Sequence, residues 1–198
     1  MKLDHLSELQ GHLLRNKNIV DLSGKVDEDM ALRFKQSFEY LVSIGCPDIR
    51  INFCSGGGRS GIGFDIYYLI RDYPGKVTGW VIGMCKSSAT TILQACDRRI
   101  AFPSGGILVH HSSSDKFHAG MFSPDGTPNE SGKRRIQKLL ETQDQKIKIL
   151  LTRMKIDGRD ALLELFGENR TLTASEALEF GLIDEVRDPC NEPFVPKE

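Results

Sequence analysis

Short runs typical of β-strands alternate with segments of helical periodicity, and this alternation constrains the fold more than any other feature of the chain. The expected strands are residues 18–22, 49–53, 77–82, 99–102, 107–109 and 182–186. Between them, apolar residues recur at helical spacing, as Met30, Phe34 and Phe38 do within residues 27–44. This order predicts an α/β fold with a mostly parallel sheet, helices on both faces and right-handed crossovers.

The helical segments and one long loop complete the expected element order. The expected helices are residues 6–14, 27–44, 62–71, 87–95, 133–154, 160–166 and 174–180. Residues 112–132 are rich in Ser, Gly, Pro and Asp without a clear period, so we expect a long exposed loop with room for a short hairpin. Gly167 is expected to end one helix, and Thr173 with Glu176 forms a capping box that begins the next.

The composition is that of one ordinary domain. With 198 residues, 39% of them hydrophobic, the chain can bury one sizeable core, so we expect a single domain over 1–188 and a loose tail over 189–198. The net charge of −1, with both signs interspersed, argues against a nucleic-acid partner. No apolar run approaches the roughly 18 residues of a membrane span. The five cysteines lack C-x-x-C spacing, which favours reduced thiols, a cytoplasmic location and neither a metal site nor a disulfide framework.

Three polar features follow predicted strands. A glycine run, Gly56 to Gly58, comes after the second strand, Ser87 follows the third, and His110 follows the fifth. Because the carboxyl ends of parallel strands meet at one edge of a sheet, we expect these residues to approach one another. A serine at a strand-to-helix turn can act as a nucleophile, since the turn exposes its hydroxyl and the following amides face the reacting oxygen.

The glycine run has more than one reading. Gly56 to Gly61 formally matches the dinucleotide-binding pattern G-x-G-x-x-G, but such a site also needs an acidic residue at the end of the next strand. Residues 77–84 contain no acid, which argues against a dinucleotide cofactor. A tight turn and a backbone-amide site for an oxyanion remain as alternatives, because adjacent glycines let the backbone approach a substrate.

Ser87 and His110 also have plain structural readings. Ser87 could serve as a helix N-cap, and His110 could be a satisfied core histidine; His111, His118 and His5 are rival bases. A catalytic serine needs a base within hydrogen-bond reach and a third group that fixes the base's tautomer. Residues 166–174 are either a linker or the source of that third group. No H-x-x-H or H-E-x-x-H spacing supports a catalytic metal.

Five blocks together carry a family resemblance: residues 18–31, 51–67, 83–93, 108–110 and 172–184. In their order and spacing they resemble the ClpP family of self-compartmentalised serine peptidases. The resemblance implies a ClpP/crotonase-like fold of stacked ββα units, with a protruding handle over about 111–154. It also implies polypeptide substrates and a homo-oligomeric ring, typically heptameric and often doubled, that an AAA+ unfoldase supplies.

The resemblance also assigns roles to individual residues. Ser87 matches the family nucleophile and His110 the general base, while the backbone N–H groups of Gly58 and Ser88 match the oxyanion hole. The family's acidic triad member falls at Asn169, which is a departure. An amide oxygen can accept from the imidazole N–H, but it cannot stabilise an imidazolium by charge; the corresponding change in a serine protease costs about 10⁴ in kcat.

The sequence therefore predicts a serine endopeptidase that forms an acyl-enzyme at Ser87, without a cofactor. One alternative is a crotonase-type acyl-CoA hydratase or isomerase, which shares the fold and the two-amide oxyanion hole but needs a carboxylate in the site. Another is a catalytically weak structural subunit of a ring, which Asn169 keeps open. Lys86 is expected to be a structural or electrostatic neighbour, because the residue before Ser87 points away from its hydroxyl.

Overall fold

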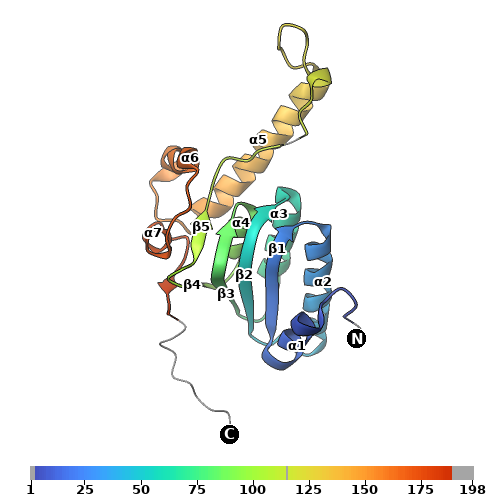
Figure 1. Cartoon of the computed structure of the whole chain (residues 1–198), viewed down its shortest axis with the longest axis vertical. Helices are drawn as coiled ribbons and strands as arrows, with labels where there is room; N and C mark the ends of the chain where they lie inside the picture. Colours follow the sequence, from blue (N-terminus) through green and yellow to red (C-terminus); the bar gives the residue numbers. More distant parts are fainter. Residues whose placement is uncertain (1–2, 115, 189–198) are drawn as a thin grey trace.

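A computed structural model describes residues 3–114 and 116–188 (Figure 1). Its strands are β1 (Ile19–Val26), β2 (Ile49–Gly58), β3 (Val77–Lys86), β4 (Arg98–Ala101), β5 (Gly106–Leu108) and β6 (Glu185–Val186). They form one sheet in the order β1-β2-β3-β4-β6, with β5 paired to β3, and every strand pairing is parallel. The α/β fold and the parallel sheet predicted from the sequence are confirmed. The tail expected after residue 188 lies outside the described residues.

The helices follow the predicted order. They are α1 (Glu8–Lys17), α2 (Glu28–Ser43), α3 (Ser60–Arg71), α4 (Ser88–Leu93), α5 (Glu130–Leu151), α6 (Gly158–Glu168) and α7 (Ala174–Glu179), with a 3₁₀ turn η1 at Ala119–Met121. The predicted capping box is present at the start of α7. The prediction for Gly167 is wrong: α6 continues through it, and Asn169 ends the helix in the left-handed conformation that asparagine tolerates.

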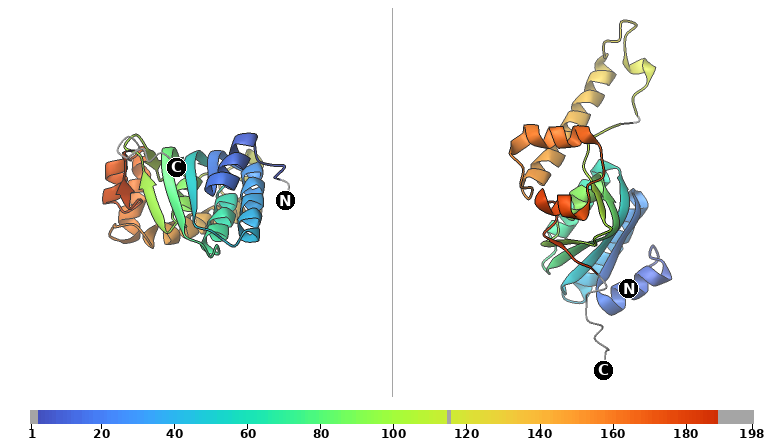
Figure 2. Two further views of the ribbon diagram at one scale, coloured as in Figure 1. Left: turned by 90° about the horizontal axis from the view of Figure 1, so that it is seen from below. Right: turned by 60° about the vertical axis from the view of Figure 1, so that its left-hand side comes forward.

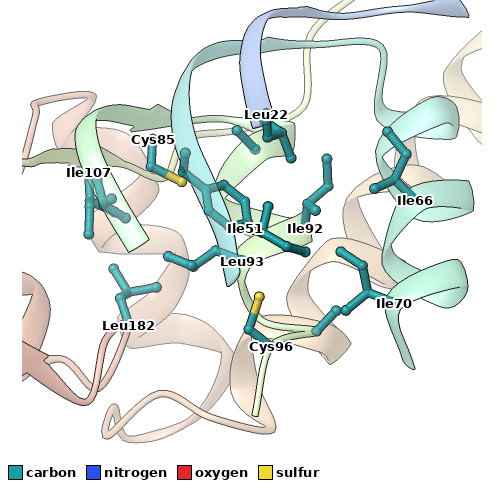
Figure 3. Packing of buried hydrophobic residues seen from close by; sticks show 14 of the residues in the cluster. Leu22, Ile51, Ile66, Ile70, Cys85, Ile92, Leu93, Cys96, Ile107 and Leu182 are labelled. Carbon is teal, nitrogen blue, oxygen red and sulfur yellow. The ribbon is translucent and has the colours of Figure 1, made fainter. Parts of the chain in front are cut away.

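Burial alternates along the central strands. In β2, Ile49, Ile51 and Phe53 are buried while Arg50 and Asn52 are only partly covered. This pattern is typical of a sheet with one face against the core and the other partly open to water. The expected cover on both faces is therefore incomplete. Helices α2, α3 and α4 lie against the buried face, where aliphatic side chains interdigitate around the sheet (Figures 2 and 3).

Strands β2 and β3 run further than expected. Both continue past a register shift between Phe53 and Ser55, so that Ser55 pairs with Cys85. Beyond it β3 pairs with β5, which brings Leu108 opposite Lys86. The carboxyl ends of β2, β3 and β5 therefore lie together at one edge of the sheet.

Helix α5 projects away from the sheet, and the segment before it runs out to the same tip (Figure 1). An antiparallel bridge between Phe122 and Pro128 closes a short hairpin there, as the sequence allowed. Gly132 lies so close to the Met121 carbonyl and Pro128 that a β-carbon would collide with them, which fixes the hairpin on the helix. Within the described residues, no helix is both long and apolar enough to cross a membrane.

Candidate active site

Ser87 occupies a strained turn between two elements. β3 ends at Lys86 and α4 begins at Ser88, and Ser87 between them has φ 57° and ψ −124°. A positive φ in a residue other than glycine costs energy and marks a conformation that the surroundings impose. The Ser87 N–H donates to the Leu108 carbonyl at 2.9 Å. Ser87 occupies the N-cap position, but its side chain makes no capping hydrogen bond, so the plain N-cap reading does not account for its hydroxyl.

The glycine run packs directly on this turn. A β-carbon added to Gly57 would lie 2.5 Å from the Lys86 carbonyl oxygen and 2.7 Å from the Ser87 β-carbon. One added to Gly58 would collide with the Val26 backbone. Only glycine fits at both positions, because a side chain at Gly57 would push the loop away from Ser87 and one at Gly58 would push it away from β1. The structure therefore brings the glycine run and the Ser87 turn together, as the sequence predicted.

The Ser55 side chain holds the glycine run in place through two hydrogen bonds. Its hydroxyl donates to the Gly24 carbonyl at 2.5 Å and accepts from the Gly57 N–H at 3.1 Å. The side chain is buried, so both bonds are shielded from water. In the sequence, Ser55 directly precedes the three glycines after the second predicted strand, which is the position from which it can bond to them.

His110 lies two residues beyond the end of β5 and is half-buried. Its pKa is lowered below the usual range, first by burial and then by the charges of Lys146 and His111; a backbone hydrogen bond at His111 opposes the shift. A neutral imidazole is the form that can accept a proton. Among the described residues no hydrogen bond joins the His110 ring to Ser87. Catalytic hydrogen bonds are often long or poorly aligned in a free enzyme and shorten when the substrate binds.

Asn169 is exposed and caps α6, with its N–H donating to the Phe166 carbonyl at 3.3 Å. Its segment nevertheless reaches the site, because Ile107 and Leu172 form an antiparallel bridge with bonds of 3.0 and 2.7 Å. Asn169 precedes Leu172 by three residues, and His110 follows Ile107 by three. Within the described part of the chain, the Asn169 side chain makes no hydrogen bond to His110.

A cavity of about 510 Å³ opens beside Gly58, between the start of α3 and helix α5. Ser87 and His110 lie outside its lining, so it adjoins the Ser87 turn instead of enclosing it. Its charged lining is predominantly basic: Lys25, Arg59, Lys116, Arg135 and Lys138 against Asp65. Among the described residues, no cluster of His, Cys, Asp and Glu could hold a metal ion.

The family model for Clp protease matches residues 3–189, which is nearly the whole chain. The chain belongs to the Clp protease family. Members of this family are typically serine peptidases, and membership implies polypeptide substrates. The blocks quoted from the sequence thus identified the family correctly.

The rival histidines of this Clp protease family member have other contacts. The Gln143 side-chain amide bonds to Nδ1 of His111 at 3.2 Å, and the His111 ring packs edge-on against Phe166. His118 is exposed at the start of η1, and the His5 N–H donates to Gln36 near the N-terminus. His111 therefore supports the chain beside His110, while the other two lie on segments away from the Ser87 turn.

Cys85 lies two residues before Ser87 and is fully buried among apolar side chains (Figure 3). Burial raises the pKa of its thiol to about 12, against a weaker opposing effect from a hydrogen bond with Thr90. A thiolate is the reactive form of cysteine, so Cys85 does not compete with Ser87 as a nucleophile.

Two residues of the site were missed in the sequence. Lys146 and Gln143 lie on α5 and bond to the chain just after β5. Lysine and glutamine in an amphipathic helix are usually exposed to solvent, so the sequence gives no reason to place these two residues at the site. The signal was their spacing, because Leu139, Gln143, Lys146 and Leu150 follow one another on a single helix face.

Proposed function

We propose that the chain is a serine endopeptidase that cleaves polypeptides through an acyl-enzyme at Ser87. The observation that carries this proposal is the strained Ser87 turn packed against Gly57. Such a turn presents a hydroxyl and backbone amides to one substrate carbonyl. Membership of the Clp protease family supports the same reaction.

The reaction follows the serine peptidase scheme. Ser87 Oγ attacks the carbonyl carbon while neutral His110 accepts the hydroxyl proton, and the N–H groups of Gly58 and Ser88 stabilise the oxyanion. His110 then donates that proton to the leaving amine, which yields the acyl-enzyme. A water molecule, deprotonated by His110, attacks the ester; the proton returns to Ser87 as the acid product leaves. Asn169 orients His110 by accepting from its second ring nitrogen.

The cavity beside Gly58 supplies room for substrate residues that flank the cleaved bond. Its basic lining favours acidic side chains there, because unlike charges raise the local concentration and rate of capture. We also propose a homo-oligomeric ring in which the projecting α5 region makes contacts between subunits, and an AAA+ unfoldase as a partner.

Labelling with a fluorophosphonate probe tests the nucleophile, since the probe forms a covalent bond with an activated serine. We expect labelling of the wild type and its loss in Ser87→Ala, with Ser131→Ala on the exposed start of α5 as the matched control. Cleavage of an unfolded casein should follow the same pattern, and native mass spectrometry reports the oligomer. Labelling that survives in Ser87→Ala would refute the assignment.

A structural, weakly active ring subunit is the second candidate. The exposed position of Asn169 favours it, because a general base without a bound third group is poorly oriented. This candidate predicts a ring in native mass spectrometry together with absent labelling of Ser87. Acyl-CoA binding without labelling would instead indicate the crotonase-type activity.

A further inference from the structure

Two side chains on α5 hold the chain that carries His110. Lys146 Nζ donates to the His110 carbonyl at 2.6 Å. The Gln143 side chain accepts from the Ser112 N–H at 2.9 Å and donates to Nδ1 of His111 at 3.2 Å. Residues three apart share a helix face, so one face of α5 holds three consecutive residues, 110 to 112.

The same short segment is anchored to the nucleophile on its other side. The Leu108 carbonyl accepts from the Ser87 N–H at 2.9 Å and from the Thr90 hydroxyl at 3.0 Å. His110 follows Leu108 by two residues and is itself held by Lys146. The backbone that carries His110 is thus fixed between the Ser87 turn and α5.

Lys146 has an unusual environment for a cation. Only 4% of the residue is exposed, and its ammonium lies 5.3 Å from the centre of the Phe166 ring. Within the described residues it forms no ion pair with a carboxylate. Burial lowers its pKa to about 8, so it still carries a charge at pH 7 in most molecules. An unpaired buried ammonium is costly, so stability alone gives no account of it.

We propose that Lys146 is a positioning residue for His110: it fixes the His110 backbone, and its charge disfavours a second positive charge on the imidazole. Gln143 supports it by fixing the two following residues. The inference rests on the proposed function, because that proposal makes His110 the general base. It adds that Lys146 and Gln143 keep His110 in place and neutral, although the triad position that holds a carboxylate in the family is Asn169 here.

The sign of the electrostatic effect follows from the groups around His110. Burial contributes most to its lowered pKa, followed by Lys146 and then the neighbouring His111. Replacing Lys146 by an uncharged residue removes the second contribution and raises the pKa of His110. A larger share of His110 is then protonated near pH 6 and cannot act as a base, whereas the share above pH 8 hardly changes.

Three variants separate positioning from mere packing. Lys146→Met keeps the length and apolar stem without the charge, Lys146→Arg keeps the charge, and Lys148→Met alters an exposed lysine of the same helix. The readout is the rate constant for fluorophosphonate labelling between pH 5.5 and 8.5. We expect Lys146→Met to be labelled more slowly than the wild type near pH 6, with the difference disappearing above pH 8, because its His110 has the higher pKa. Lys146→Arg should recover most of the rate, and Lys148→Met should match the wild type.

A second measurement does not depend on catalysis. The His110 ring is titrated by NMR in Ser87→Ala protein, with and without Lys146→Met. Methionine removes a buried charge and keeps the apolar stem, so the variant should fold, and circular dichroism checks this. A raised His110 pKa supports the inference even if wild-type labelling fails and the proposed function falls. An unchanged pKa, or a labelling loss equal at every pH, overturns it.

Discussion

Gly57→Ala should show how far the close contact between the glycine run and the Ser87 turn matters for reactivity, apart from its effect on the stability of the protein. The new β-carbon would meet the Lys86 carbonyl and the Ser87 β-carbon, at 2.5 and 2.7 Å. The first contact is with backbone, which cannot rotate away as the end of a flexible side chain can. The loop or the Ser87 turn must therefore move.

The cost has two parts that the structure separates. Gly57 has φ +87°, where a residue with a β-carbon loses about 1 kcal/mol. Forcing an extra methyl group into a packed site adds about 1–3 kcal/mol. The total is about 2–4 kcal/mol, less than the about 5–15 kcal/mol of a typical domain, so the variant should fold. A displacement near 1 Å at the site can slow the reaction by about 10²-fold.

Gly126→Ala is the matched control, because Gly126 has φ +82° with nothing within 4 Å of a new β-carbon. Denaturant unfolding should show a loss of about 1 kcal/mol for this control. Fluorophosphonate labelling, corrected for the folded fraction, should be unchanged in the control and strongly slowed in Gly57→Ala. Equal labelling rates in the two folded variants would refute the contact between the glycine run and the nucleophile turn.

Three further outcomes are expected. Asn169→Asp should accelerate Ser87 labelling, by up to about 10⁴-fold if the side chain reaches the base, whereas equal rates in Asn169→Asp and Asn169→Ala would remove it from the site. Arg99→Ala should lower stability by about 3–5 kcal/mol in urea unfolding, because the buried guanidinium bonds to neighbouring carbonyl and carboxylate groups; Arg98→Ala, at an exposed pair, should cost less than about 1 kcal/mol. Cys85 should resist iodoacetamide at pH 8 in the folded protein, and its rapid alkylation, read by mass spectrometry, would contradict the raised pKa.

Much of the fold could be predicted because the signals were local. The strand and helix order follows from periodicity, and the capping box at Thr173 and Glu176 is a contact between near neighbours in sequence. The end of α6 differs from the prediction for a local reason as well. Gly167 resembles a helix stop, but Asn169 adopts the left-handed conformation instead, with φ 47°.

The candidate site was only partly predictable because its supports are long-range. Strand order implies that Ser87, Gly58 and His110 approach one another, since parallel strand ends share an edge. The bond from Lys146 to His110 joins residues 36 apart, and no periodicity specifies it. The bridge between Ile107 and Leu172 likewise depends on how the last third of the chain returns to the sheet.

The positive φ of Ser87 also sets the stability of the fold against the activity of the protein at this position. Its backbone lies where glycine is favoured, and holding serine there costs on the order of 1–3 kcal/mol. Ser87→Gly should therefore raise the melting temperature while removing the hydroxyl. If the protein is a peptidase, its most stable sequence at this position is an inactive one, so stability and activity are in direct conflict at a single residue.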